Sequence, residues 1–364
     1  MIGRTNYSPI GLDAGARTMK AVQLVHTRTG PRIHAAAGFP RITPGEALNP
    51  AEILRAAAVL RRQGFVGNRI VVSIPATQML SGVVELPARS GGAPLDAIAR
   101  QELARACRKE PQSIELSWWE LPASGAGARA AQGTQAIALG CTHTDANALL
   151  ACFDPAGMDV LAIDARPATI ARACTPLLSD PPNLTAILDL GYGAAHILIL
   201  AGRTLVYERT LAEASLRLLA SGVANQLSTD DVLADYILRV VGCRPLADVP
   251  DHGAAFEQAE DARALICAHA DAIAGELRTS MTYATRRFEG ELTRILLSGA
   301  GADIPGLSER LAQRTGTEAI IARVDALAAA PANIDPALLG PGAIVALGLA
   351  LHNAPLPALA GGGA

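Results

Sequence analysis

Residues 10–24 read IGLDAGARTMKAVQL, a stretch typical of two short strands joined by a tight glycine turn. Apolar residues lead into Asp13, Gly15 allows the turn, and the apolar pattern resumes at Met19. Such a turn exposes backbone N–H groups, with the carboxylate of Asp13 and the hydroxyl of Thr18 beside it. Because the carboxylate alone would repel a phosphate, the motif indicates a phosphate that carries a divalent cation. Taken singly, an ordinary hairpin is the more common explanation of such a short glycine motif.

A second stretch repeats this plan. Residues 186–200 read AILDLGYGAAHILIL, in which Asp189 and Gly191 correspond to Asp13 and Gly15 at one constant interval along the chain. An internal repeat of this kind predicts two similar half-molecules. We therefore expect the two acid-glycine hairpins to face each other across a cleft that closes on a phosphate chain.

A third glycine stretch lies nearer the C-terminus. Residues 294–307 read RILLSGAGADIPGL, which predicts a buried strand, a turn through Gly299 and Gly301, and a helix that starts near Pro305. The glycines would let a flat ring or a sugar lie against the main chain. The alternative is a plain strand-to-helix connection of an α/β protein.

The order of these three motifs resembles that of the actin, sugar kinase and heat-shock chaperone superfamily. More closely, the chain is similar to the PilM family of actin-like type IV pilus assembly proteins, which is related to FtsA. The stretch DAGARTMKAV matches the family's Asp-Ile-Gly-Ser motif and Lys-Ala-Val strand, and residues 346–350, ALGLA, match its closing helix. The resemblance runs from about Pro9 to His352. It implies an α/β fold with two actin-like lobes, each of the duplicated ribonuclease H-like type, and an inserted α+β subdomain.

The resemblance also implies how the chain is divided. The expected parts are a first lobe in residues 1–68 and 161–182, an inserted subdomain in residues 69–160, a second lobe in residues 183–352 and a disordered tail in residues 353–364. Trp118 and Trp119 lie on an expected strand of the inserted subdomain. Since adjacent strand residues point to opposite faces, at least one of them should face the core, and the other could face a partner.

Roles for individual residues follow from the same resemblance. ATP would bind between the lobes, with Mg²⁺ held by Asp13 and Asp189. Asp189 and Asp164 are the catalytic candidates, Asp164 as a residue that orients water at the floor of the cleft. The expected nucleotide-binding residues are Asp13, Gly15, Thr18, Lys20, Gly191, Gly193, Asp235, Gly299 and Gly301.

Three places depart from the family pattern. Residues 194–195 are both alanine where relatives have a serine or threonine that meets a phosphate, and residues 213–214 read EA where relatives have two glycines. Leu238 stands where a lysine would hold the ribose and base together with Asp235. Each hydrogen bond lost to a charged group removes about 1.5–3 kcal/mol of interaction. We therefore expect weakened ATP binding and at most weak hydrolysis.

Composition excludes several classes of function. The chain of 364 residues has 31 basic and 34 acidic residues and a net charge of −3, so it lacks the positive field that is typical of nucleic-acid-binding proteins. Its six cysteines are far apart and include no CxxC pair, which predicts buried, reduced thiols and no zinc site. The sequence shows no signal peptide and no apolar run of about 18 residues, so we expect a cytoplasmic protein that does not insert into a membrane.

The function implied by the resemblance is that of a cytoplasmic scaffold in a type IV pilus or type II secretion-like assembly. It would lie at the inner membrane by binding the N-terminal cytoplasmic peptide of a PilN-like partner with one membrane span. The peptide would lie between the first lobe and the inserted subdomain, and residues 71–75 and 95–108 are the candidates for its groove. Nucleotide would set the closure of the lobes, and a homo-oligomer is compatible with this function. The alternatives are a small-molecule kinase with Asp189 as base and an FtsA-like filament former.

Overall fold

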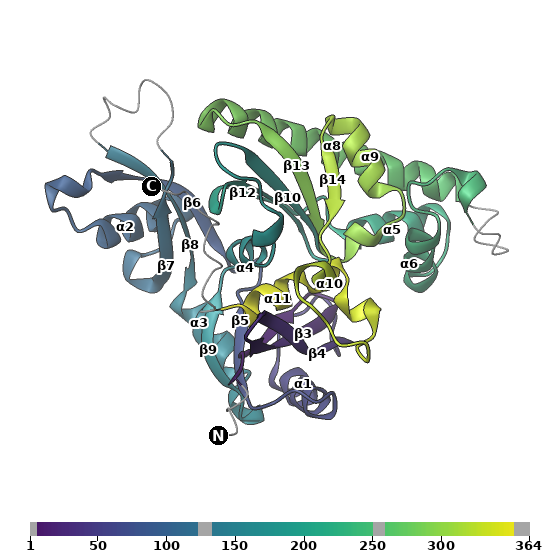
Figure 1. The fold of residues 1–364 in the computed structure, drawn as a ribbon, viewed down its shortest axis with the longest axis horizontal. Coiled ribbons are helices and arrows are strands. Elements are labelled where there is room, and N and C mark those ends of the chain that lie inside the picture. Colours follow the sequence, from purple (N-terminus) through teal and green to yellow (C-terminus); the bar gives the residue numbers. More distant parts are fainter. Residues whose placement is uncertain (1–5, 123–132, 250–258, 353–364) are drawn as a thin grey trace.

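The computed structural model describes residues 6–122, 133–249 and 259–352 (Figure 1). Three sheets make up the described part of the chain, and helices lie between and around them. The tail expected in residues 353–364 lies outside the described residues.

The first lobe is built on a six-stranded sheet. Its strand order is β1-β3-β2-β5-β9, with β4 also paired to β3. The strands are β1 (Asn6–Tyr7), β2 (Ile10–Ala14), β3 (Thr18–Thr27), β4 (Gly30–Pro40), β5 (Arg69–Ser73) and β9 (Asp159–Asp164).

The second lobe repeats this sheet. Its order is β12-β11-β10-β13-β14, in which β10, β11 and β12 form an antiparallel meander and β13 and β14 join in parallel. The strands are β10 (Leu184–Leu190), β11 (Ala195–Ala201), β12 (Thr204–Leu211), β13 (Leu292–Ser298) and β14 (Glu318–Ile321). The strands β2, β3, β4, β5 and β9 pair in the same sequence of directions. The expected duplication is therefore confirmed.

A three-stranded antiparallel sheet forms the inserted unit. Its order is β6 (Leu80–Pro87), β8 (Gly133–Thr142) and β7 (Ile114–Glu120), and helix α2 (Leu95–Cys107) packs on it. The boundary expected at residue 69 differs from this pairing, because β5 joins β2 in the first sheet and β9 joins β5. The sequence of a short apolar strand such as β5 does not indicate which sheet the strand joins. In the structure β5 belongs to the first sheet.

The other helices pack on the two larger sheets or on one another. They are α1 (Pro50–Arg62), α3 (His143–Ala151), α4 (Arg166–Ala173), α5 (Leu216–Gln226), α6 (Asp231–Val240), α8 (Ala259–Phe288), α9 (Leu307–Thr315), α10 (Val324–Leu327) and α11 (Ile344–Ala350). Short 3₁₀ turns lie at Arg89–Gly91, Pro111–Ser113, Asp154–Ala156, Thr175–Leu177, Leu246–Asp248, Ala300–Asp303, Pro336–Leu339 and Pro341–Ala343.

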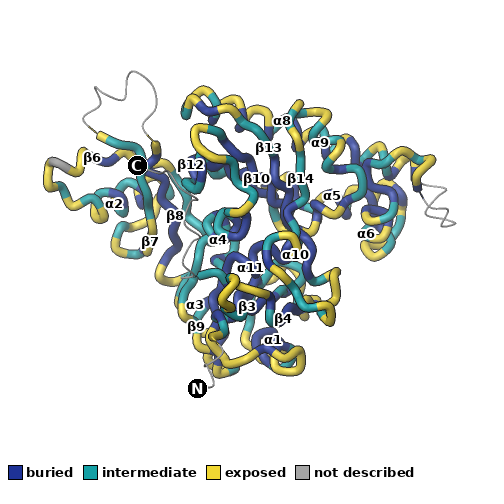
Figure 2. Tube along the Cα trace, in the orientation of Figure 1, coloured by how far each residue is buried: buried dark blue, intermediate teal, exposed yellow. Residues whose placement is uncertain are grey.

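Helices α4 and α11 join the two lobes. They pack on each other, α11 also lies on β2 and β3, and α4 contacts β11 and β12 (Figure 1). One continuous apolar cluster consequently runs from this face of the first sheet into the second lobe, while a second cluster fills the space under α1. The buried segments in Figure 2 follow this distribution, with β10 and β11 in the interior and the outer turns of α2 and α6 exposed. Strands of a sheet that is covered on both faces are mainly apolar, and β10 and β11 are buried along nearly their whole length.

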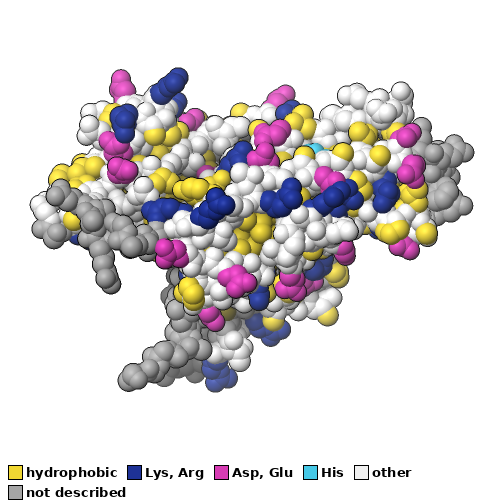
Figure 3. Space-filling model, turned by 90° about the horizontal axis from the view of Figure 1, so that it is seen from above, with side chains coloured by type: hydrophobic (Ala, Val, Ile, Leu, Met, Phe, Trp, Pro, Cys, Tyr) yellow, Lys and Arg dark blue, Asp and Glu magenta, His cyan; other side chains and the backbone are white. Residues whose placement is uncertain are grey.

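The surface carries mixed charge. On the face shown in Figure 3, Lys and Arg side chains form a row, with acidic side chains beside it. Within the described residues, Asp271 on α8 accepts hydrogen bonds from both Arg310 and Arg314 of α9. Among the helices in the described ranges, none combines the length and the apolar character that a membrane span requires.

Candidate functional site

The two acid-glycine hairpins lie against each other between the lobes. A Cβ atom built on Gly15 would lie 2.8 Å from the carbonyl oxygen of Thr18, and one built on Gly191 would lie 2.6 Å from that of Ala194, so both turns need glycine at the equivalent position. A Cβ atom built on Gly193 would lie 3.3 Å from the Cβ of Ala16 in the opposite hairpin. The turns of the two lobes therefore approach each other closely.

A cavity of about 590 Å³ follows these turns. Eight of the nine residues expected to bind nucleotide line it, and Gly301 does not: the eight are Asp13, Gly15, Thr18, Lys20, Gly191, Gly193, Asp235 and Gly299. The cavity continues beyond the hairpins to the end of β5 and the start of the connection to β6, residues 72–78, and to α3. Of the two groove candidates, the first lines the cavity in part and the helix at 95–108 does not.

Gly299 and Gly301 serve the packing of the second lobe. A Cβ on Gly299, whose φ is 81°, would lie 2.5 Å from the carbonyl oxygen of Leu190, and one on Gly301 would lie 2.8 Å from the Leu190 Cβ. The turn after β13 can thus cross the end of β10 only without these side chains. Both glycines are buried, and of the two Gly299 lines the cavity.

Arg166 lies between the two carboxylates that were expected to hold the metal. Its Nη1 is 3.3 Å from Oδ1 of Asp13, and its Nη2 and Nε are 2.8 and 2.9 Å from Oδ2 of Asp189. Both aspartate side chains are almost fully buried, and that of Arg166 is 16% exposed. Asp189 also accepts a hydrogen bond of 2.9 Å from the Ser298 hydroxyl. Asp189 is therefore fully occupied by protein groups, and it is absent from the cavity wall.

The charges of this group stabilise one another. Burial alone would raise the pKa of Asp189, but attraction to Arg166 and to His196 outweighs it and holds the pKa below its usual range. Burial opposes the charge of Arg166, and the attraction of Asp189 and Asp13 more than compensates, so its pKa rises above the usual value. Asp189 and Arg166 are therefore both charged at neutral pH.

A second arginine crosses the cleft. Arg17, in the first hairpin, forms an ion pair with Asp235 of α6. Its guanidinium also lies 5.1 Å from the ring centroid of Tyr192 in the opposite hairpin. Asp235, which was expected to bind the ribose, is therefore already paired with a side chain of the first lobe.

Asp164, the expected orienter of water, faces away from the cavity. Its Oδ2 accepts a hydrogen bond of 2.8 Å from Arg172 and lies 3.3 Å from Nδ1 of His352, and its Oδ1 accepts one from the backbone of Ala165. Asp164 is not part of the cavity wall. These contacts fix α4 and the end of α11 to the first sheet, which gives Asp164 a structural explanation.

Arg166 and Arg17 were not singled out from the sequence. Arg166 carried a signal, because it opens α4, and the positive end of the helix dipole disfavours a cation there. A basic residue at the N-terminus of a helix is stabilised by acidic partners, and Asp13 and Asp189 are those partners for Arg166.

The carboxylates do not fit a magnesium ion as they stand. Mg²⁺ requires six oxygen ligands in octahedral geometry at about 2.0–2.1 Å, and the guanidinium of Arg166 takes the space between Asp13 and Asp189. An ion placed there would be repelled by that guanidinium at short range. In the part of the chain that the structure describes, no cluster of three or more His, Cys, Asp or Glu residues is arranged to hold a metal.

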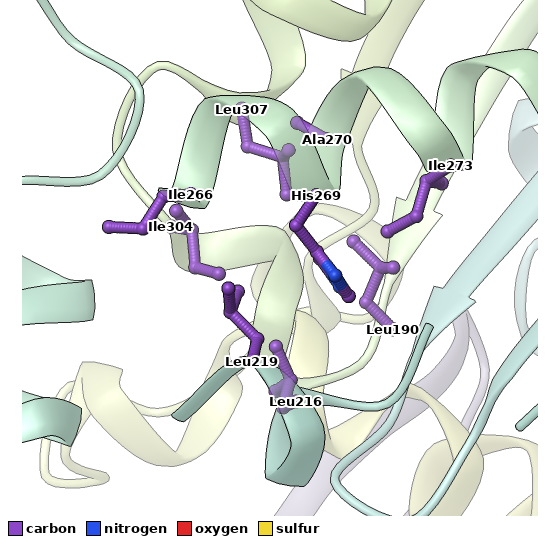
Figure 4. Close-up of a pocket in the computed structure, with 9 residues that line it drawn as sticks. All are labelled: Leu190, Leu216, Leu219, Ile266, His269, Ala270, Ile273, Ile304 and Leu307. Carbon is purple, nitrogen blue, oxygen red and sulfur yellow. The ribbon is translucent and has the colours of Figure 1, made fainter. Parts of the chain in front are cut away.

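His269 lies on α8 beside the cleft. Its ring points into a small apolar pocket of about 10 Å³ (Figure 4), and among the described residues its Nε2 has no hydrogen-bond partner. The pocket is lined by Leu190, Leu216, Leu219, Ile266, His269, Ala270, Ile273, Ile304 and Leu307. Burial lowers the pKa of His269, and a hydrogen bond with the backbone of Ala214 opposes this only in part. The ring is therefore neutral in the folded protein.

This burial predicts a dependence of stability on pH. In the unfolded chain His269 binds a proton near its usual pKa of 6.5, whereas the folded protein resists protonation. The free energy of unfolding should therefore fall as the pH drops below about 6.5, down to the lowered pKa of the folded state. The His269→Met variant should lose less free energy of unfolding than the unmodified protein between about pH 7.5 and about pH 5.5, because it lacks the contribution of His269. Urea unfolding at both pH values measures the difference. An equal fall in the variant and the unmodified protein would contradict the prediction.

Comparison with known proteins identifies the fold. Neither a protein-family model nor a curated protein matches the chain. Among solved structures it is similar to the PilM-PilN type IV pilus biogenesis complex, with a TM-score of 0.75 and 19% identity over 95% of this chain and 98% of that chain. It is also similar to the ethanolamine utilization protein EutJ from Carboxydothermus hydrogenoformans, with a TM-score of 0.53 and 13% identity over 95% of this chain and 89% of that one.

A further similar structure is MreB5 of Spiroplasma citri bound to ADP, with a TM-score of 0.51 and 11% identity over 94% of this chain and 95% of that chain. At these identities the likeness is one of fold. The expected actin-like fold is confirmed, and the chain is PilM-like in its architecture over nearly its whole length.

Proposed function

We propose that this chain is a cytoplasmic actin-like scaffold that belongs with the PilM proteins of a type IV pilus or type II secretion-like assembly. It binds the N-terminal cytoplasmic peptide of a single-span, PilN-like inner-membrane protein and so lies at the inner membrane. The observation that supports this most is the match to the PilM-PilN complex, which extends over 95% of this chain and 98% of that chain. The three sheets support a division into two lobes and an inserted unit in which β5 belongs to the first lobe.

The cavity offers a place for such a peptide. Two segments connect the first sheet to the inserted sheet, namely residues 74–79 before β6 and α3 after β8, and both contribute to the cavity wall. Apolar side chains line this part, among them Val72, Ile74, Leu149 and Phe153. An extended peptide with small apolar residues would bury those residues against this part of the cavity wall, next to Ala148, which is exposed.

For the cleft between the lobes, we propose that a nucleotide binds weakly and is not hydrolysed. The cavity wall retains the two hairpin turns, Lys20 and Gly299, which suit a phosphate chain. A kinase would need Asp189 as a base in contact with its substrate, but Asp189 is bonded to Arg166 and Ser298 and does not reach the cavity. This arrangement favours a scaffold over a phosphotransferase.

Two variants on one helix test the peptide site. Ala148 is exposed and lines the cavity, and its neighbour Asn147 is exposed and does not line it. We expect Ala148→Arg to weaken binding at least about tenfold, a loss of about 1.4 kcal/mol, because the long charged side chain fills the groove. Asn147→Arg is the matched control and should bind as the unmodified protein does.

Binding is measured by fluorescence anisotropy, with the labelled N-terminal cytoplasmic peptide of a PilN-like single-span membrane protein from the same organism. Lack of binding by the unmodified protein would contradict the function. Equal binding by Ala148→Arg would contradict the location of the groove.

A further inference from the structure

Arg166 connects parts of the molecule that would otherwise repel each other. Asp13 belongs to the first lobe and Asp189 to the second, and both carboxylates are almost completely buried. Two buried negative charges facing one gap destabilise a closed cleft unless a cation lies between them. The hairpin geometry supplies one position for that cation, and the guanidinium of Arg166 occupies it.

We propose that Arg166 takes the place of a divalent cation between Asp13 and Asp189, so that the lobes close, and the cleft receives a phosphate ligand, without magnesium. The inference deepens the nucleotide part of the proposed function. Peptide binding does not depend on it, so the failure of one leaves the other standing.

The geometry at Arg166 supports this assignment. The side chain approaches Asp189 with two nitrogen atoms and Asp13 with a third, so the planar fork of the guanidinium is used on both lobes. Arg166 starts α4 directly after β9, and the hydrogen bonds of Arg172 to Asp164 and to the carbonyl oxygen of Gly348 hold that helix in place. The guanidinium is therefore a fixed part of the structure, as a bound metal would be.

The rest of the cleft has the charge that a metal-free phosphate needs. Basic side chains in the cavity wall outnumber acidic ones: Arg17, Lys20, Arg41, Arg166, Arg217 and Arg239 face it, against Asp13, Glu46 and Asp235. Arg17 is paired with Asp235, Arg41 with Glu52, and Arg166 with Asp13 and Asp189, so Lys20, Arg217 and Arg239 are the cations that a phosphate can use. Lys20 lies opposite Asp13 in the strand pairing, and within the described residues its ammonium group forms no ion pair. A phosphate chain whose charge is not shared with a metal can be neutralised by these protein cations.

Thermal unfolding with and without magnesium tests the inference. The unmodified protein should unfold at the same midpoint in EDTA and in millimolar magnesium. Arg166→Gln should unfold at a lower midpoint in EDTA, and magnesium should restore at least half of the loss, because the freed carboxylates can then ligate the ion.

Two control variants separate a metal site from general salt effects. Arg166→Lys keeps a positive charge between the carboxylates and should respond little to magnesium. The double variant Arg166→Gln with Asp13→Asn removes one of the two carboxylates and should lose the recovery. A midpoint of the unmodified protein that rises with magnesium would overturn the proposal, and so would an Arg166→Gln variant that ignores magnesium.

A second measurement decides the matter if the variant does not fold. Titration of the unmodified protein with Mn²⁺, followed by electron paramagnetic resonance of the free ion, should show no tightly bound manganese. One bound manganese ion per chain at micromolar affinity would overturn the proposal.

Discussion

Replacing Gly348 by Ala is expected to destabilise the protein by more than about 3 kcal/mol, because helix α11 has no space for a side chain at this position. A Cβ atom there would lie 2.0 Å from the carbonyl oxygen of Thr169 and 2.6 Å from its carbonyl carbon, both in the backbone of α4. On the first sheet, Gly11 of β2 makes an equally close approach, with its added Cβ 2.1 Å from the carbonyl oxygen of Ala346. Helix α11 thus lies between the backbones of α4 and β2. A backbone segment cannot move aside as easily as a flexible side chain can.

Urea unfolding measures the effect, and Gly275→Ala is the matched control. Gly275 also lies inside a helix, α8, but an added Cβ would meet nothing within 4 Å. This control should gain about 0.5–1 kcal/mol from the helix propensity of alanine. If Gly348→Ala were as stable as the unmodified protein, the packing of α11 against α4 would be wrong.

Replacing Trp119 by Ala is expected to cost about 3 kcal/mol, because this side chain fastens the inserted unit to the second lobe. Its ring packs on the core cluster that includes Leu121 and Leu139, and its Nε1 donates a hydrogen bond of 2.8 Å to the carbonyl oxygen of Leu205 on β12. A second link between the same parts is the hydrogen bond of 2.9 Å from Arg287 to Gln135.

Trp119→Phe separates the two contributions of this residue. Phenylalanine retains most of the packing and loses the hydrogen bond, so it should cost only about 1 kcal/mol. Both variants are compared by urea unfolding followed by circular dichroism. A Trp119→Ala variant no less stable than Trp119→Phe would show that the ring does not hold the two parts together.

Much of the fold could be predicted because its determinants are local. The turn at Gly15 and its repeat at Gly191 are each specified within a few residues, and the apolar strands around them follow from the pattern of side chains. The opposite orientation of the tryptophans was also predicted from strand geometry. The structure adds that Trp118 packs on the core of the inserted unit and donates a hydrogen bond to Asp96, so both rings have partners within the chain.

The remaining features depend on contacts between distant segments. Asp13 and Asp189 had the residue type and position of metal ligands, but their charge is neutralised by Arg166, which no local pattern near either aspartate reveals. The family resemblance placed Asp164 at the floor of the cleft as a residue that orients water, whereas its partners Arg172 and His352 come from α4 and the end of α11. The pairing of β5 with β2 likewise joins segments that are separated in the sequence by β3, β4 and α1.

The affinity of the unmodified protein for ATP, determined by calorimetry once in EDTA and once in excess magnesium, distinguishes a cleft bridged by Arg166 from a magnesium site. We expect weak binding that is equal or weaker with magnesium, because Arg166 already occupies the place of the metal and magnesium reduces the charge of the nucleotide. Binding that is at least about tenfold tighter with magnesium, a gain of about 1.4 kcal/mol, would contradict this expectation.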